Sequence, residues 1–385
     1  MAFASPVVVF SHLRWDFVFQ RPQHILSRLA ARRPVLFVEE PEPDRAGPPR
    51  WERSSPAAGV TVLRPRTPRP EPGFHPSQVE LIGPMLDEVR TAAHSPELLT
   101  WLYTPLALPL AQQLDPALVV YDCMDELSLF LGAPPELVRR EAELLEQADI
   151  VFTGGPSLYR AKQGRHPNVH CFPSSVDAAH FGRAQAGAEA PPAEPDDQRG
   201  LPHPRLGYYG VIDERLDLPL LATLADARPD WQIVLVGPVV KIDPAALPRR
   251  PNIHYTGQRR YDELPAYLAG WDVCLLPFAL NDSTRFISPT KTLEYMAAER
   301  PIVSTPITDV AEPYGEIVRL GDSAEGFVRA CERALHADAE DRARRAALMR
   351  GVLARTSWDA TVAAMEACLA TSLARRGIPA ASASA

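Results

Sequence analysis

Short apolar segments rich in β-branched residues alternate with helical stretches along most of this chain. Each segment precedes a stretch with helical periodicity, as RPQHILSRLAARR follows the first. In the first half the segments are PVVVF (6–10), VLFVEE (35–40), LLTWLYT (98–104), LVVYDC (118–123), DIVFTGG (149–155) and NVHCFPS (168–174). This alternation predicts a parallel sheet covered by helices on both faces, with functional sites at the carboxyl ends of its strands.

The alternation stops once and then starts again. Residues 178–204 lose all periodicity and consist mainly of Ala, Pro, Gly and acidic residues, which predicts a linker. The restarted segments are RLGYYG (205–210), WQIVLVG (231–237), NIHYTG (252–257), DVCLLPF (272–278), PIVST (301–305) and EIVRL (316–320). A chain of 385 residues exceeds one typical core, so we expect two α/β domains, 1–177 and 205–357.

Two regions depart from the simple pattern. Residues 41–76 are dense in Pro and Arg, and only VTVLRP (60–65) favours a strand, so a long loop around one strand is expected. After a charged helix over 339–355, the segment 358–374 predicts one more amphipathic helix. Residues 375–385 are expected to form a flexible tail.

Composition excludes several classes of function. The net charge of −8 argues against general nucleic-acid binding, which needs a basic face. The chain has no apolar run of membrane-spanning length and no signal-peptide pattern at its start, so we expect a cytoplasmic protein. Five scattered cysteines form no metal-ligand pattern, and no GxGxxG follows a strand. We therefore expect neither a bound metal nor a dinucleotide cofactor.

The stretch FISPTKTLEYMAAERPIVSTP (286–306) combines a helix start with a phosphate site. Ser288 is a suitable N-cap, and the sequence predicts a helix from Thr290 to Arg300. The N-terminus of such a helix attracts phosphate, and Lys291 adds a full charge. Glu294 lies on the same face and can accept hydrogen bonds from a ribose diol. We expect both side chains on the exposed face of the helix.

A capped helix with a solvated Lys–Glu pair would give the same spacing. The chain has only three lysines, at 162, 241 and 291, so a lysine at this helix start favours the binding interpretation.

Carboxylates follow one of the strands in the first half. YDCMDE places Asp122 and Asp125 at a strand end, where one of them, Asp125 by preference, can act as a general base. The alternative is that both residues cap the local turn and helix. His12, directly after the first strand, is a second candidate base or a hydrogen-bonded loop residue. The remaining candidates for shaping a cleft here are Asp16, Gln20 and Arg21.

Several stretches together resemble the GT-B glycosyltransferases, in particular a bacterial, family-4-like branch that makes cell-surface polysaccharides of the teichuronic-acid type. They are SHLRWDFVFQRPQHILSRLA (11–30), VVYDCMDE (119–126), ADIVFTGGPSLYRAK (148–162), NVHCFPSSVDAAHF (168–181) and SPTKTLEYMAAERPIVST (288–305). The resemblance implies two Rossmann-like domains facing a cleft, with a sugar-nucleotide donor on the second domain and an acceptor on the first. It also implies that the helix over 358–374 returns to the first domain, anchored by Trp358.

The resemblance assigns roles to individual residues. It implies that Lys291 contacts the diphosphate and Glu294 the ribose. Arg215 lies where relatives hold the pyrophosphate, with Gly210 allowing close approach, and the Gly257–Gln258 turn lies where they hold the nucleobase. The full set expected to bind the nucleotide sugar is Ser288, Thr290, Lys291, Glu294, Arg215, Gly210, Gly257 and Gln258.

One position departs from the family pattern. Retaining members carry a second glutamate eight residues before the position of Glu294, where this chain has Phe286. This favours an inverting reaction with Asp125 as base.

The sequence thus predicts a glycosyltransferase that moves a sugar from a nucleoside diphosphate to a hydroxyl of a saccharide or lipid-linked saccharide. Alternatives are a sugar-nucleotide epimerase of the same fold and a non-catalytic sugar-nucleotide-binding partner. Membrane contact, if present, is expected to be peripheral and to use the arginines between Arg45 and Arg69.

Overall fold

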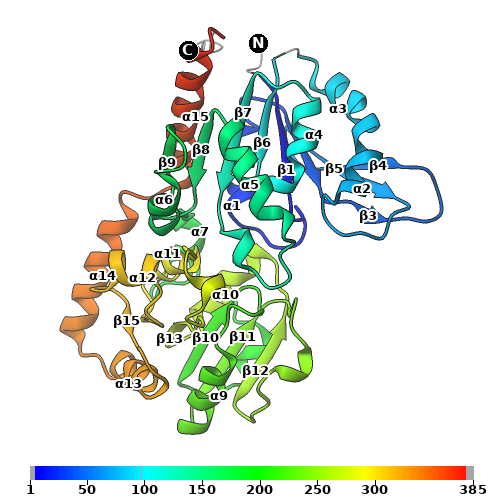
Figure 1. The fold of residues 1–385 in the computed structure, drawn as a ribbon. Coiled ribbons are helices and arrows are strands. Elements are labelled where there is room, and N and C mark those ends of the chain that lie inside the picture. Colours follow the sequence, from blue (N-terminus) through cyan, green and yellow to red (C-terminus); the bar gives the residue numbers. More distant parts are fainter. Residues whose placement is uncertain (1–4, 96, 379–385) are drawn as a thin grey trace. The chain divides into compact units, whose positions relative to one another are not determined.

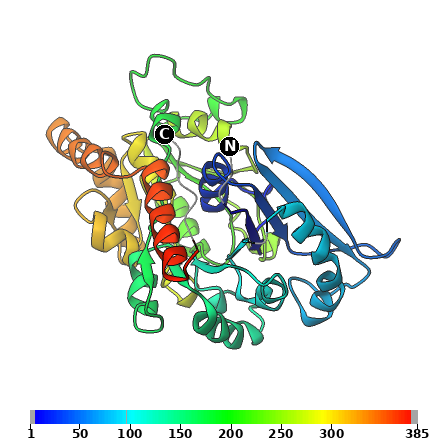
Figure 2. The ribbon, with the colours of Figure 1, turned by 90° about the horizontal axis from the view of Figure 1, so that it is seen from above.

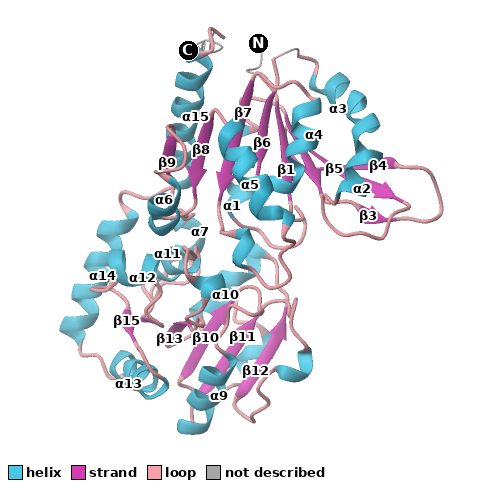
Figure 3. Ribbon diagram, in the orientation of Figure 1, coloured by secondary structure: helices cyan, strands magenta, loops and turns pink. Residues whose placement is uncertain are grey.

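The computed structural model describes residues 5–95 and 97–378, which form two compact units, each built on a parallel sheet (Figure 1; Figure 3). Among the described residues, unit 1 comprises 5–95, 97–128, 132–173 and 358–378, and unit 2 comprises 129–131 and 174–357. Both are described separately below. The predicted α/β class with two parallel-sheet domains is confirmed.

Unit 1 contains a nine-stranded sheet with β1 near its centre, and the strand order is β3-β5-β2-β1-β6-β7-β8-β9 with β4 paired to β5. The strands are β1 (Val7–Ser11), β2 (Val35–Glu39), β3 (Glu42–Pro43), β4 (Arg50–Ala57), β5 (Val60–Thr67), β6 (Leu99–Leu102), β7 (Leu118–Cys123), β8 (Ile150–Thr153) and β9 (Val169–Cys171). Its helices are α1 (Arg21–Leu29), α2 (Pro76–Ile82), α3 (Leu86–Ala93), α4 (Leu108–Gln113), α5 (Glu136–Gln147), α6 (Pro156–Lys162) and α15 (Trp358–Arg375). The central strands are continuous apolar runs because both faces of the sheet are buried.

The expected loop over residues 41–76 is more ordered than predicted. β4 runs antiparallel to β5, and the two-residue turn between them includes Gly59, whose φ of 73° lies in the left-handed region. The sequence RWERSSPA of β4 is mostly exposed and lacks apolar alternation, so its periodicity did not indicate a strand. Pairing with β5, rather than burial of a face, makes this segment a strand.

The last helix, α15, belongs to unit 1, as predicted. It packs on α1, which is separated from it by more than three hundred residues of sequence (Figure 2, red and dark blue). Trp358 is 1% exposed, and its ring stacks on the imidazole of His24 with centroids 4.7 Å apart. Its side chain anchors the start of the returning helix.

Unit 2 contains a six-stranded parallel sheet in the order β12-β11-β10-β13-β14-β15. The strands are β10 (Arg205–Tyr209), β11 (Gln232–Val236), β12 (Ile253–Gly257), β13 (Val273–Leu276), β14 (Ile302–Ser304) and β15 (Arg319–Leu320). The helices are α7 (Ala178–Gly182), α8 (Asp196–Arg199), α9 (Leu218–Ala227), α10 (Leu264–Ala269), α11 (Lys291–Ala297), α12 (Thr308–Tyr314), α13 (Ala324–Leu335) and α14 (Ala339–Leu353).

The strand order of unit 2 reverses between β10 and β13. From β10 the chain proceeds outward to β11, and from β13 it proceeds the other way to β14, so right-handed crossovers place α9 and α11 on opposite faces. The packing agrees, because α9 contacts α13 whereas α11 contacts α14 and α7. Ligands of open α/β sheets bind at such a reversal, outside the carboxyl ends of the strands.

The prediction of a linker over residues 178–204 is wrong, because these residues lie within unit 2. Phe181 of α7 is fully buried and packs against Tyr209 and Tyr261. Gln198 of α8 is also fully buried, where it accepts a hydrogen bond from the Trp271 indole at 2.8 Å. Isolated contacts such as these order the segment, and they produce no periodicity in the sequence.

Candidate functional site

The carboxyl end of β10 brings together the residues predicted to hold a diphosphate. Gly210 follows β10 with a φ of 135°, and a Cβ at this position would lie 2.2 Å from Cε of Lys291. The lysine side chain therefore extends across the end of β10, with its Nζ 5.5 Å from the centroid of the Tyr208 ring. The reversal of strand order thus places a cation from α11 over the backbone of β10.

A second glycine allows the ends of neighbouring strands to approach each other closely. Gly237 follows β11 with a φ of 149°, and a Cβ there would lie 1.9 Å from the carbonyl oxygen of Gly210. Gly237 also donates its N–H to the carbonyl of Gly257 at 2.9 Å, so the ends of three adjacent strands meet. Gly210 and Gly257 were among the predicted site residues, whereas Gly237, which also ends an apolar run in WQIVLVG, was not.

The helix α11 starts later than predicted. Its first residue is Lys291 and its N-cap is Thr290, which has helical dihedral angles and makes no side-chain capping bond. Ser288 is therefore not the N-cap, and its carbonyl accepts a hydrogen bond from the Ser174 hydroxyl at 3.2 Å. The Pro289–Thr290 pair forms an initial turn instead, in which the Pro289 carbonyl accepts the N–H of Thr292 at 3.2 Å.

Glu294 is buried, in contrast to the exposed position expected from the sequence. Its residue exposure is 8%, because α11 packs between the sheet and the helices α7 and α14. Burial raises the pKa of the Glu294 carboxyl to about 7, although the Tyr209 hydroxyl and the Lys291 ammonium oppose this shift. A buried carboxyl whose pKa is raised in this way is a candidate binding group, because a ligand that supplies hydrogen-bond donors offsets the cost of its burial.

Arg215 is engaged by a neighbouring carboxylate. Its guanidinium donates three hydrogen bonds to Asp213, at 2.6 to 3.0 Å, and Asp213 is 4% exposed. The loop after β10 therefore presents Arg215 as half of an ion pair, not as an isolated cation. Gln258, after β12, is exposed next to Gly257.

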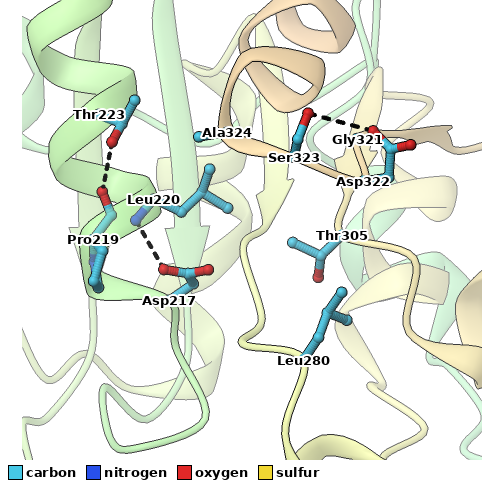
Figure 4. A pocket seen from close by; sticks show the side chains of 10 residues that line it. All are labelled: Asp217, Pro219, Leu220, Thr223, Leu280, Thr305, Gly321, Asp322, Ser323 and Ala324. Carbon is cyan, nitrogen blue, oxygen red and sulfur yellow. Dashed lines mark hydrogen bonds between the residues drawn. The ribbon is translucent and has the colours of Figure 1, made fainter.

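A separate cavity of about 350 Å³ lies near the starts of α9 and α13 (Figure 4). Two of its polar residues serve as helix caps: Asp217 accepts the N–H of Leu220 at 2.8 Å, and Ser323 accepts that of Gly326 at 3.1 Å. Neither Lys291 nor Glu294 lines this cavity. It is therefore distinct from the predicted nucleotide site.

In unit 1 the two carboxylates after β7 have different environments. Asp122 is fully buried and accepts hydrogen bonds from the Arg21 guanidinium at 2.9 and 3.4 Å. Arg21 is 2% exposed and also donates to the carbonyl of Phe172 at 2.6 Å. Two predicted roles are therefore wrong. Asp122 is not a catalytic base and Arg21 is not a cleft residue, because the two form a buried ion pair.

Asp125 is half-buried in the loop after β7, and a buried lysine holds that loop. Lys162 of α6 is 1% exposed, and its Nζ lies 2.6 Å from carboxylate oxygens of both Glu126 and Glu141. Glu141 also accepts the Tyr121 hydroxyl at 2.9 Å. No sequence pattern predicted this network, although Lys162 is one of only three lysines in the chain.

The other candidates of unit 1 lie after β1. His12 is half-buried there, directly after Ser11. The Asp16 side chain is 73% exposed and pairs with Arg64 at 3.3 Å. Gln20 is the N-cap of α1, whose residue Gln23 donates to the carbonyl of Trp15 at 2.8 Å. Gln20 thus has a capping role, whereas His12 and Asp16 belong to a loop at the carboxyl edge.

Within residues 5–95 and 97–378, no three His, Cys, Asp or Glu side chains are grouped so as to hold a metal ion. In the same part of the chain, no helix has both the length and the apolar character needed to cross a bilayer.

Residues 204–337 match the family model for glycosyl transferases group 1, and this range contains β10, α11 and the site around Lys291. The chain carries a group 1 glycosyltransferase domain. Over 295 residues it is also 26% identical to TuaH of Bacillus subtilis (strain 168), named for teichuronic acid biosynthesis, covering 71% of this chain and 72% of TuaH. The predicted enzyme class is confirmed.

Solved structures extend the likeness of this glycosyltransferase to both units. Sucrose-phosphate synthase from Thermosynechococcus elongatus superposes with a TM-score of 0.68 at 17% identity, covering 96% of this chain and all of that one (100%). HepE of Anabaena, in complex with UDP and glucose, superposes with a TM-score of 0.64 at 14% identity, covering 95% and 99%. At these identities the likeness concerns the fold, which is GT-B.

Proposed function

We propose that this glycosyltransferase transfers a sugar from a nucleoside diphosphate to a hydroxyl of a saccharide or lipid-linked saccharide, in the synthesis of a cell-surface polysaccharide. The observation that carries the donor assignment is the buried Glu294, one turn after Lys291 at the carboxyl end of β10. Lys291 supplies charge to the diphosphate, and Glu294 accepts the ribose hydroxyls. The polysaccharide context follows from the similarity to TuaH.

The remaining donor residues take smaller roles in this proposal. Backbone groups around Gly210 and Gly237 approach the diphosphate closely, since neither residue carries a side chain. Arg215 changes partner from Asp213 to the diphosphate when the donor binds. Ser288 and Thr290 contribute from the turn before α11, and the Gly257–Gln258 turn contacts the base. We propose that the reaction needs no metal, because the cationic groups of unit 2 stabilise the leaving diphosphate.

For the acceptor we propose groups of unit 1. Asp122 is excluded as base by its pairing with Arg21, which leaves Asp125 as the carboxylate of choice, with His12 and Asp16 beside the acceptor. Phe286 in place of the second glutamate supports an inverting displacement, in which Asp125 removes the proton from the attacking hydroxyl.

A screen of nucleoside diphosphates by thermal stabilisation tests the donor assignment. We expect one of UDP, GDP or ADP to raise the melting temperature of the native chain and not that of Glu294→Ala. Stabilisation of both proteins to the same extent would refute the site.

Turnover tests the base. Asp125→Asn is expected to lower transfer by roughly 10²- to 10⁴-fold with nearly unchanged donor affinity. Normal turnover in this variant, or a product with the anomeric configuration of the donor in its NMR spectrum, would contradict inversion through Asp125.

We propose that the arginines between Arg45 and Arg69 make only a weak, peripheral contact with the membrane. Four of the six are already paired with carboxylates: Arg50 with Asp44, Arg53 with Glu88, Arg64 with Glu39 and Arg66 with Glu52. Arg45 and Arg69 would contribute about 1 kcal/mol each at an anionic surface. Sedimentation with phosphatidylserine vesicles should therefore show weak binding that disappears in salt, and its absence at low salt would refute the contact.

A further inference from the structure

The last residue of β10, Tyr209, neighbours Glu294, the proposed ribose contact. Its ring is 3% exposed and is fixed by aromatic neighbours on three sides, with centroids 6.1 Å from Phe181, 5.7 Å from Trp271 and 5.1 Å from Tyr295. The backbone N–H of Tyr209 also donates to the Tyr295 hydroxyl at 3.3 Å. The position of the Tyr209 hydroxyl is therefore set by packing and does not depend on any ligand.

That hydroxyl is buried without a hydrogen bond of ordinary geometry, and the acceptor that it faces is the Glu294 carboxyl. Leaving a buried hydroxyl unsatisfied costs free energy, and an ionised carboxylate is the partner that best recovers it. The groups that act on the Glu294 carboxyl are the Tyr209 hydroxyl of β10 and the Lys291 ammonium of α11, with the Tyr295 hydroxyl of α11 nearby. Tyr209 is the one among them that belongs to the sheet.

We propose that Tyr209 is a positioning residue, whose hydroxyl holds the Glu294 carboxylate in the orientation that accepts both hydroxyls of a ribose diol. This inference rests on the proposed function, because it requires a nucleoside diphosphate at Lys291 and Glu294. One carboxylate oxygen accepts from Tyr209, and the lone pairs directed to the site accept from the diol. The tyrosine thereby gives the enzyme its preference for ribonucleotides over 2′-deoxyribonucleotides.

The structure offers a matched control in unit 1. Tyr121 is 2% exposed and donates its hydroxyl to the buried carboxylate of Glu141 at 2.9 Å. Tyr121→Phe therefore removes the same chemical group from the same kind of partner, outside the nucleotide-binding unit. Any effect on nucleotide recognition that is common to both variants reflects general loosening of the fold.

The experiment measures by calorimetry the affinities of UDP, GDP and ADP and of their 2′-deoxy counterparts for the native chain, Tyr209→Phe and Tyr121→Phe. For the ribonucleotide that binds best, we expect Tyr209→Phe to reduce the ribose-over-deoxyribose ratio by roughly three- to tenfold. The same variant should move the pH midpoint of binding upward, because the carboxylate loses a stabilising donor. Tyr121→Phe should leave both quantities unchanged.

Two results would overturn the inference in distinguishable ways. If a nucleotide binds the native chain and Tyr209→Phe keeps both its ratio and its pH midpoint, Tyr209 has only a packing role and the proposed function stands. If no nucleoside diphosphate binds the native chain, the proposed donor site fails and the role of Tyr209 fails with it.

Discussion

Asp122 in unit 1 and Glu294 in unit 2 are both buried carboxyl groups near the carboxyl edge of a parallel sheet, but they have different partners. Asp122 is enclosed with the guanidinium of Arg21, which donates two hydrogen bonds to it. Burial raises the pKa of both carboxyls, and that of Glu294, which faces a tyrosine hydroxyl and a lysine, reaches about 7. The first carboxyl is paired with a fully buried cation, whereas the neighbours of the second are a hydroxyl and a half-buried ammonium.

This difference separates a structural acid from a binding acid. A buried ion pair that is fully hydrogen-bonded has no capacity left for a substrate, so its loss should affect folding. A buried acid that is undercompensated destabilises the empty protein and is retained where a ligand supplies the missing donors. Substitution at the two positions should therefore produce opposite patterns of stability and binding.

The largest effect is expected from Asp122→Asn. The substitution leaves the Arg21 guanidinium buried beside a neutral amide, which should lower the free energy of unfolding by about 3–5 kcal/mol. Denaturant unfolding measures this change. Asp16→Asn is the control, because Asp16 is 73% exposed in its pair with Arg64 and should cost less than about 1 kcal/mol. Equal small effects from both variants would show that the Arg21–Asp122 pair does not hold unit 1 together.

Glu294→Gln should show the reverse pattern. We expect nucleoside diphosphate affinity to fall by about 1.5–3 kcal/mol, because hydrogen bonds to a charged acceptor are lost. Stability in the absence of ligand should stay the same or increase, since a buried ionisable group is replaced by a neutral one. Calorimetric titration and denaturant unfolding of the same preparation measure both quantities. Loss of stability with intact binding would assign Glu294 to the structural class with Asp122.

The sequence predicted the strands that are buried on both faces, because burial requires a run of apolar residues. It did not predict the strands and helices that are held by a few specific contacts. Apolar runs such as VVVF and IVLV indicated the central strands, because a parallel sheet buries both faces. β4 has an exposed, polar sequence, so only its pairing with β5 identifies it as a strand. Likewise α7 and α8 are each ordered by one buried residue, Phe181 or Gln198, which no periodic pattern can reveal.

The same distinction applies to the candidate site. Lys291 and Glu294 were found from their spacing on a helix, but the burial of Glu294 depends on helices α7 and α14, which are distant in the sequence. The pairing of Asp122 with Arg21 joins residues 101 positions apart, so the sequence kept Asp122 as a candidate base beside the preferred Asp125. Spacing predicts which residues share a face, and only tertiary packing decides which of them are already paired.

Lys291→Ala extends the comparison to the cation of unit 2. Lys291 lies across Gly210 and Tyr208, and we expect its loss to weaken diphosphate binding by about 1.5–3 kcal/mol. The salt dependence of binding should decrease in this variant, because a charge–charge contact is removed. Titrations of native chain and variant at two salt concentrations measure this salt dependence. An unchanged salt dependence would place the diphosphate away from Lys291.

The smallest effect is expected from pH, and its sign follows from the raised pKa of Glu294. In the folded protein this carboxyl has a pKa of about 7, compared with an ordinary value of 4.5. Its contribution to stability is therefore complete below about pH 4.5 and is lost as the pH rises through about 7. Ligand binding has the opposite dependence, because the ribose hydroxyls need the ionised form as acceptor.

Between pH 6 and 8 the ionised fraction of a group with this pKa rises about tenfold, so nucleoside diphosphate affinity should rise by up to about 1.4 kcal/mol. Calorimetry across this range measures the change, and Glu294→Gln is the control, because it retains the titration of the ligand phosphates and lacks that of the carboxyl. If the native chain and Glu294→Gln have the same pH profile, the carboxyl is already ionised in the empty protein. The contrast with Asp122 would then lie in accessibility to ligand and not in missing donors.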